Sequence, residues 1–358
     1  MPIIQIALDD RSYPVFVEDG LLANTAKLLE EHQLSHLRPA IISDETVASH
    51  HAESLLKSFG ENPPTLHTVP AGEASKSMAQ VESLCREMIR AGHDRRSLII
   101  ALGGGVVGDL AGFVASIFYR GVPFIQIPTT IVSQVDSSVG GKTGVNTTEG
   151  KNLLGAFHQP KLVIVDPETL HTLPAREFHE GFAEAIKHAA IRDAEMLTEL
   201  KAIDPEKRDV PADLLARNIA IKARIVEEDE YETKDIRALL NFGHTIGHGI
   251  EASLPYGEML HGEAISLGIR AALFLSEKHS GLSPQASAEV HELLSHFNLP
   301  LKLQDSIATS TILEKLARDK KFRSGKIRFV TLSNLGKAGV IETVSLADLE
   351  KAIEHLRN

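Results

Sequence analysis

The first half of the chain alternates between short apolar runs and longer amphipathic stretches. The apolar runs predict strands at 3–8, 15–17, 40–43, 66–69, 98–102, 124–127 and 162–165. The stretches between several of them place apolar residues three or four positions apart and predict helices at 21–34, 46–59, 78–91 and 110–117. Such alternation is typical of an α/β domain with a mostly parallel sheet. Because Pro14 cannot donate a ladder hydrogen bond, its strand is expected at the sheet edge.

After residue 168 the pattern becomes mainly helical. Long helices are predicted at 212–230 and 262–279, and a late strand pair at 327–332 and 339–344. A length of 358 residues also favours two cores over one. We therefore predict an α/β domain over residues 1–168 and a mainly helical domain over residues 169–358.

Composition narrows the class of protein. The net charge of −11 and the lack of a dense Lys/Arg run argue against a nucleic-acid surface. Cys85 is the single cysteine, so no intrachain disulfide forms, and its place on the apolar side of a helical pattern favours a packing role. The N-terminal residues lack a basic, then apolar, signal pattern, and no apolar run approaches membrane-spanning length. We expect a cytoplasmic protein that does not insert into membranes.

A glycine-rich turn follows the predicted strand at 98–102. Gly103, Gly105 and Gly108 fill the pattern G-x-G-x-x-G between a strand and a helix, which suits a dinucleotide pyrophosphate. The acidic residue that a Rossmann fingerprint expects after the next strand is missing from 122–128. The motif alone therefore fits a plain strand-to-helix turn equally well.

Other predicted strand ends carry small polar residues. Asp44, Thr129 with Thr130, and the stretch 72–76 each follow a strand, where ligands of open α/β sheets bind. Asp44 is equally suited to cap the helix after it. Together these loops favour a Rossmann-like nucleotide cleft in the first domain.

Metal-ligand residue types gather in the second half. Glu184, His244, His248 and His261 each lie in an apolar, glycine-punctuated segment. A single histidine there is usually a hydrogen-bonded core residue, but one carboxylate with several imidazoles favours a divalent metal with an open position. His244 and His248 are four apart and share a helix face, so both are candidate ligands. Three further histidines remain open as alternatives: His171, His179 and His188.

Lysines and an arginine accompany these candidates. The polar linker 136–152 sets Lys142 and Lys151 beside glycines, an arrangement that suits phosphate or carboxylate capture, or else a solvated loop. Lys187 follows Glu184 by three positions, and Arg237 precedes Asn241 by four, so each pair is expected to share a helix face. We predict a basic pocket on the metal side.

Taken in order, these motifs resemble the 3-dehydroquinate synthase family of the sugar phosphate cyclases. The resemblance runs from about residue 44 to residue 321 and rests on these segments: 72–76 (GEASK), 103–109 (GGGVVGD), 120–122 (RGV), 128–130 (PTT), 136–142, 151–153 (KNL), 183–187 (AEAIK), 237–248, 261–263 (HGE) and 319–321 (DKK). Two departures, His188-Ala189 and Gly249, touch no proposed ligand.

The resemblance implies roles for individual residues. It implies Zn²⁺ (or Co²⁺) held by Glu184, His244 and His261, with His248 contacting the substrate phosphate instead. It implies NAD bound by Asp44, Ala71, Gly72, Glu73, Ala74, Ser75, Lys76, Gly105, Val106, Val107, Gly108, Asp109, Thr129, Thr130, Lys142, Lys151, Thr169, Leu170, His171 and Thr172. It implies substrate contacts from Arg120, Asp136, Lys142, Asn152, Lys187, Lys222, Arg237, Asn241, His248 and either Lys320 or Lys321.

The reaction that the family implies converts 3-deoxy-D-arabino-heptulosonate 7-phosphate to 3-dehydroquinate and phosphate, in the shikimate pathway of aromatic amino acid biosynthesis. NAD is transiently reduced, phosphate is eliminated, the hydride returns and the ring closes by an aldol step, so there is no net redox change. Arg120 matches a residue that serves the neighbouring subunit, which implies a homodimer. The alternatives are an inosose or valiolone type cyclase, a metal-dependent alcohol dehydrogenase resembling glycerol dehydrogenase, and a non-catalytic binding protein on the same fold.

Overall fold

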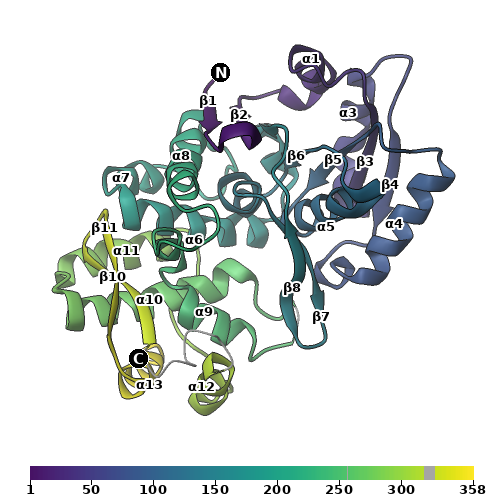
Figure 1. Cartoon of the computed structure of the whole chain (residues 1–358). Coiled ribbons are helices and arrows are strands. Elements are labelled where there is room, and N and C mark those ends of the chain that lie inside the picture. Colours follow the sequence, from purple (N-terminus) through teal and green to yellow (C-terminus); the bar gives the residue numbers. More distant parts are fainter. Residues whose placement is uncertain (256, 318–326) are drawn as a thin grey trace. The chain divides into compact units, whose positions relative to one another are not determined.

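The computed structural model of the protein describes residues 1–255, 257–317 and 327–358 (Figure 1). The chain forms two compact units: residues 1–173 with 208–223, and residues 174–207 with 224–358. Lys320 and Lys321 lie outside the described residues, so the choice between them stays open. None of the helices in the described part of the chain is both long and apolar enough to cross a membrane.

The first unit is built on a seven-stranded sheet with the order β1-β2-β9-β6-β5-β3-β4. Strand β1 pairs antiparallel with β2, and every other neighbouring pair is parallel, which confirms the predicted mostly parallel sheet. The strands are β1 (Ile3–Ile6), β2 (Tyr13–Val17), β3 (Arg38–Asp44), β4 (Thr65–Val69), β5 (Ser97–Gly103), β6 (Phe124–Pro128) and β9 (Val163–Val165).

Helices cover both faces of this sheet. Alternate strand residues point to opposite faces, so Ile41 packs with helices α1 and α3, whereas Ile42 packs with α4 and α5. The helices are α1 (Thr25–Glu31), α2 (Glu45–Val47), α3 (Glu53–Ser58), α4 (Met78–Arg90) and α5 (Gly105–Ile117). The helix predicted at 110–117 therefore begins earlier, at Gly105, directly after the glycine-rich turn.

The expectation that the strand of Pro14 forms the sheet edge is wrong. Strand β2 lies between β1 and β9. Its pairing with β9 covers Val15 to Val17 and starts one residue after Pro14, while Pro14 itself faces Gln5 of β1. The proline thus lies outside the stretch where β2 is paired on both sides, and its missing N–H interrupts no ladder with β9.

The segment predicted as a polar linker forms a β-hairpin instead. Strands β7 (Lys142–Thr147) and β8 (Gly150–Phe157) pair antiparallel and extend as a long ribbon (Figure 1). The hairpin packs on α5 at a close approach, because a Cβ added to Gly112 would meet the Thr143 methyl group at 2.4 Å. A run of polar residues and glycines concealed these strands from the sequence pattern.

The second unit is mainly helical, as predicted. Its antiparallel pair, β10 (Ile327–Asn334) and β11 (Lys337–Val344), confirms the late strand pair. Its helices are α6 (Ala175–Arg192), α7 (Glu195–Lys201), α9 (His244–Glu251), α10 (His261–Ser280), α11 (Pro284–His296), α12 (Thr309–Ala317) and α13 (Leu346–His355). One of the three boundaries between the units falls inside α8 (Ala212–Glu228), after Ala223.

Candidate metal and cofactor sites

Glycines bring helices α9 and α10 into direct backbone contact. A Cβ on Gly268 of α10 would lie 1.9 Å from the carbonyl oxygen of Gly243, which precedes α9 and has a φ of 79°. A Cβ on Gly247 of α9 would lie 3.0 Å from the carbonyl oxygen of Ala264. This close crossing places the first residues of the two helices, His244 and His261, beside each other, with ring centroids 5.5 Å apart.

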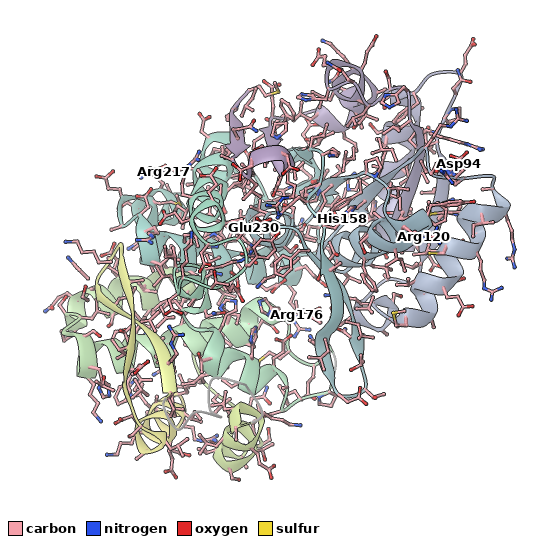
Figure 2. All side chains as sticks on the ribbon, in the orientation of Figure 1. Asp94, Arg120, His158, Arg176, Arg217 and Glu230 are labelled. Atoms are coloured by element: carbon pink, nitrogen blue, oxygen red, sulfur yellow. The ribbon has the colours of Figure 1, made fainter. Side chains whose placement is uncertain are left out.

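Helix α6 adds the carboxylate of Glu184 to these histidines. Its turn at Glu180 contacts the start of α10, since the Glu180 Oε2 atom accepts the Gly262 N–H at 2.5 Å. Arg176, labelled in Figure 2, donates two hydrogen bonds of 2.7 Å to the Glu263 carboxylate. These contacts hold α6 against α10 and set Glu184, which is fully buried, next to His261.

Three ligand-type atoms converge in this cluster. The Oε1 atom of Glu184 lies 3.2 Å from Nε2 of His244 and 3.4 Å from Nε2 of His261. Two ligand atoms on a tetrahedral ion, each about 2.0–2.1 Å from it, are about 3.3 Å apart. The same oxygen is buried and makes no hydrogen bond among the described residues. The donor set therefore fits a divalent metal such as Zn²⁺.

The other ring nitrogens of these histidines are anchored. Nδ1 of His244 donates to the Phe242 carbonyl at 3.1 Å, and Nδ1 of His261 lies 3.3 Å from the Glu251 carboxylate. Such contacts fix the ring and leave Nε2 to face a metal. His248 lies on the same face of α9, as predicted, with its ring 5.0 Å from that of His244. One ring nitrogen of His248 lies within 4.8 Å of one ring nitrogen each of His244 and His261. By geometry, His248 is therefore also a candidate metal ligand.

Glu184 lies among charged groups of both signs. Burial raises the pKa of Glu184, but Lys187 and His244 outweigh it and hold the pKa well below its usual range. Burial lowers the pKa of His261, yet the carboxylates of Glu184 and Glu251 raise it to about 10. Lys187 pairs with Glu184, which confirms that the two share one face of α6. The carboxylates of Glu184 and Glu251 beside these imidazoles also suit a bound metal ion.

In the first unit, the carboxyl ends of three adjacent strands carry predicted cofactor residues. Asp44 ends β3, Gly103 ends β5, and Thr129 follows β6 at the same edge of the parallel sheet. Helix α5 begins just beyond Gly104, which offers no side-chain cap, so its first N–H groups suit an anion. The Oγ1 atom of Thr129 is buried and has no hydrogen-bond partner among the described residues. This edge fits a dinucleotide.

Asp44 also has the second role that its sequence allows. Its Oδ1 atom accepts the N–H groups of Thr46 and Val47 at 2.9 Å, so it caps α2. The capping uses one carboxylate oxygen, and the second suits a ribose hydroxyl. The two interpretations of Asp44 are thus compatible.

The loop after β4 contacts both α5 and the hairpin. Lys76, which is 5 % exposed, pairs with Asp109 in the first turns of α5 at 2.5 Å. The Lys76 carbonyl accepts the Asn146 N–H at 2.9 Å, and the Asn146 side chain donates to Glu73 at 2.7 Å. Gly72 has a φ of 102°, a conformation that side chains disfavour. The predicted cofactor residues Gly72, Glu73, Lys76 and Asp109 thus form one connected group.

The predicted cofactor stretch 169–172 forms the end of a 3₁₀-helix, Pro167–Thr172. Thr169 is buried and accepts a hydrogen bond from Gln134 at 3.1 Å, so it also has a structural role. Thr172 contacts His51 at 2.7 Å, and His171 is exposed.

Of the predicted substrate residues in the first unit, two form an ion pair and two others are exposed with a left-handed backbone. Lys222 and Asp136, 86 positions apart in the chain, form an ion pair of 2.9 Å, and Lys222 also donates to the Asp136 carbonyl at 2.6 Å. Arg120 and Asn152 are exposed and have φ values of 70° and 57°, which are uncommon for residues other than glycine (Figure 2 labels Arg120). Strained backbone of this kind clusters at functional sites.

Arg237 and Asn241 lie in a 3₁₀-helix, Arg237–Asn241. The expectation that they share a helix face is wrong, because residues three apart, not four, are aligned in this helix type. Arg237 is 2 % exposed, and Asn241 lies three residues before His244 at the start of α9. Of the alternative histidines, His179 donates its Nε2–H to the Pro205 carbonyl oxygen at 3.2 Å.

Sequence reasoning missed three acidic residues that support these sites. Glu180 lies one helical turn before Glu184, and Glu251 lies three residues after His248, so helical spacing was a usable signal for both. Asp229 gave no such signal, since its contacts are backbone amides of a loop.

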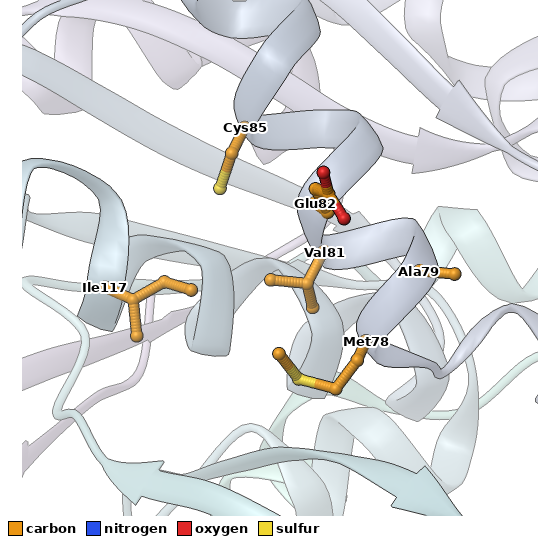
Figure 3. Close-up of a pocket in the computed structure, with 6 residues that line it drawn as sticks. All are labelled: Met78, Ala79, Val81, Glu82, Cys85 and Ile117. Carbon is orange, nitrogen blue, oxygen red and sulfur yellow. The ribbon is translucent and has the colours of Figure 1, made fainter.

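A shallow apolar groove of about 450 Å³ lies outside the predicted sites (Figure 3). It is lined by residues of α4 and α5, namely Met78, Ala79, Val81, Glu82, Cys85 and Ile117. Burial raises the pKa of the Cys85 thiol, which disfavours the reactive thiolate. The packing role predicted for this cysteine agrees with that environment.

Solved structures of two cyclases share this architecture. One is 2-deoxy-scyllo-inosose synthase complexed with carbaglucose-6-phosphate, NAD⁺ and Co²⁺, at a TM-score of 0.88 and 26 % identity, over 99 % of this chain and 100 % of that one. The other is 2-epi-5-epi-valiolone synthase from Streptomyces hygroscopicus with NAD⁺ and Zn²⁺, at a TM-score of 0.87 and 31 % identity, over 98 % of each chain. The fold of this chain is that of these sugar phosphate cyclases.

Sequence comparison narrows this class to a family. The family models for the N-terminal and C-terminal parts of 3-dehydroquinate synthase match residues 66–180 and 181–322. The 3-dehydroquinate synthase of Bacillus pumilus is 41 % identical over 359 aligned residues, 99 % of this chain and 98 % of that protein. The chain belongs to the 3-dehydroquinate synthase family.

Proposed function

We propose that this protein is a 3-dehydroquinate synthase that uses NAD and a divalent metal. It would convert 3-deoxy-D-arabino-heptulosonate 7-phosphate to 3-dehydroquinate and phosphate, as a phosphate-eliminating carbon–oxygen lyase. The observation that carries the proposal is the convergence of Glu184, His244 and His261 in a chain that aligns over nearly its whole length with such synthases. Cytoplasmic location remains a prediction.

The proposal assigns the metal to Glu184, His244 and His261, and NAD to the strand ends of the first unit. When bound at these residues, the cation would supply Lewis acidity toward substrate hydroxyls, and NAD⁺ would supply a reversible acceptor for hydride. The protein's part is orientation: the anchored Nδ1 atoms fix both imidazoles, and the buried carboxylate of Glu184 is kept ionised at neutral pH.

The cationic and polar residues are proposed to hold the anionic substrate. Lys142, Asn152, His248 and Arg120 are assigned to its phosphate, Arg237 and Lys222 to its carboxylate, and Lys187, Asp136 and Asn241 to its hydroxyls. Several of these groups are already engaged within the protein, as in the Lys222–Asp136 and Lys187–Glu184 pairs. Such fixed positions favour catalysis by orientation and by charge placed before the substrate arrives.

Phosphate release from the heptulosonate phosphate tests the proposal. We expect release that needs NAD, stops after chelation of the metal, returns with Zn²⁺ or Co²⁺, and leaves no net NADH. Net NADH from a simple alcohol would identify a dehydrogenase. Turnover of glucose 6-phosphate or sedoheptulose 7-phosphate in place of the heptulosonate would identify an inosose or valiolone type cyclase.

We also propose a homodimer in which Arg120 serves the partner's site. The exposed position and left-handed backbone of Arg120 support this assignment. Mixing inactive Arg120→Ala with inactive His261→Ala protein should restore part of the activity, since each mixed dimer then contains one complete site. A mixture that stays inactive, while the two variants form mixed dimers, refutes the shared site.

A further inference from the structure

A buried carboxylate organises the loop that leads to Arg237. Oδ1 of Asp229 accepts the N–H groups of Thr233 and Lys234 at 2.7 and 3.1 Å, and Oδ2 accepts the N–H of Arg237 at 3.1 Å. Asp229 is 2 % exposed. Hydrogen bonds to a charged acceptor are stronger than neutral ones, so this carboxylate is the anchor around which residues 230–237 fold.

The loop contains backbone strain that such an anchor offsets. Glu232 and Asp235 have φ values of 57° and 66°, in the left-handed region that residues other than glycine rarely adopt. Strain of this kind persists where surrounding contacts fix the chain. Asp229 holds one part of the loop, and the ion pair of Asp235 with Arg328 of β10 holds the other.

The side chain of Arg237 depends on the same loop. Its Nη1 atom donates to the Glu230 carbonyl (Figure 2 labels Glu230), and its Nε atom lies 3.7 Å from the Glu232 carboxylate. Arg237 itself is 2 % exposed. Both acceptors belong to the loop whose backbone amides Asp229 holds. The position of the Arg237 guanidinium therefore follows from the position of the Asp229 carboxylate.

We propose that Asp229 is a positioning residue that holds Arg237 ready for the carboxylate of the substrate. The inference rests on the proposed function, in which Arg237 binds that carboxylate. A guanidinium recognises a carboxylate through two parallel hydrogen bonds, so a small rotation removes one of them. Asp229 touches no reacting group and acts through backbone amides.

The variant Asp229→Asn tests this role in the metal- and NAD-loaded enzyme. An amide side chain keeps the size but turns one acceptor into a donor, which then faces a backbone N–H. We expect KM for the heptulosonate phosphate to rise roughly tenfold to hundredfold, with a smaller change in kcat and unchanged zinc content.

Asp348→Asn is the matched control. Asp348 lies in the same unit, is 8 % exposed and accepts a backbone N–H, that of Ser345, at 3.0 Å. It completes the capping box of α13 with the N-cap residue Ser345 and contacts Lys278, so its loss should lower the melting temperature without changing KM. An equal rise of KM in both variants would show a general loss of stability and would overturn the positioning role.

Two further measurements separate the possible outcomes. If Asp229 acts through Arg237, adding Asp229→Asn to Arg237→Gln should lower kcat/KM little further; additive losses contradict the inference. Hydrogen exchange of residues 230–241 should accelerate in Asp229→Asn, and unchanged exchange also overturns it. Exchange does not depend on the substrate, so it tests whether Asp229 anchors this loop even if the wild type releases no phosphate, a result that refutes the proposed function alone.

Discussion

Replacing Gly268 by alanine should separate the two helices that carry His244 and His261. The added Cβ would lie 1.9 Å from the Gly243 carbonyl oxygen and 2.7 Å from the Gly247 nitrogen, whereas ordinary contacts begin at 3.4 Å. Both neighbours are backbone atoms, so no side chain can rotate away, and α9 must shift relative to α10 by about 1 Å or more. Overpacking of this kind costs about 1–3 kcal/mol, more than the helix propensity that alanine gains.

The same shift should weaken metal binding. Metal–ligand distances tolerate about 0.2 Å, so a movement of this size at His244 relative to His261 should lower zinc affinity roughly tenfold or more. We would measure thermal unfolding of the metal-free protein and zinc affinity by competition with a chelator. Gly339→Ala is the control, because a Cβ there meets nothing within 4 Å. If Gly268→Ala matches this control in both stability and zinc affinity, the helix crossing does not position the ligands.

Three other changes test separate parts of the structure. Burial and Arg38 lower the pKa of His93 to about 4, below its unfolded value of 6.5, so its contribution to stability is present above pH 6.5 and is lost as the pH falls toward 4. In His93→Gln, the free energy of unfolding should therefore change less with pH in this window, by about 2 kcal/mol or less after allowance for solvent screening. An unchanged pH profile contradicts this. Glu251→Gln removes the carboxylate beside His261 and should weaken cobalt binding about tenfold in a chelator titration; affinity equal to wild type would count against an orienting role. Lys76→Met leaves Asp109 without its cation and should weaken NAD binding in calorimetry while zinc content stays constant; unaltered NAD affinity would remove Lys76 from the cofactor site.

Much of the fold could be predicted because the chain's apolar patterns are strong. The runs around Ile41 and Ile100 are buried on both sheet faces and read clearly as strands. The β7–β8 hairpin could not be predicted in this way, since β8 is exposed along most of its length and has no apolar alternation. The position of Pro14 was misjudged because strand order depends on pairings between distant segments, which local sequence does not record.

The candidate site, too, could be predicted only where local sequence carries the information. Residue types and helical spacing indicated Glu184, Lys187, His244 and His248, because these lie on regular helices where spacing determines direction. His261 comes from a separate helix, and only the glycine-lined contact between α9 and α10 sets its distance from His244. The role of Asp229 was hidden for a related reason: its partners are main-chain amides, which every residue carries, so no residue type marks them.

In the second unit, the glycines and the ligand residues have different roles. The side chains of Glu184, His244 and His261 determine which ion is bound, but their separations of 3.2 and 3.4 Å follow from how closely the helix backbones approach. Backbone contact needs glycine at Gly268 and Gly247, because any larger residue keeps the helices apart. A chain that kept all three ligands but lost these glycines should therefore fold with a weakened metal site. Ligand motifs alone are thus insufficient grounds for assigning the metal, and the glycines between the helices belong to the same functional signature.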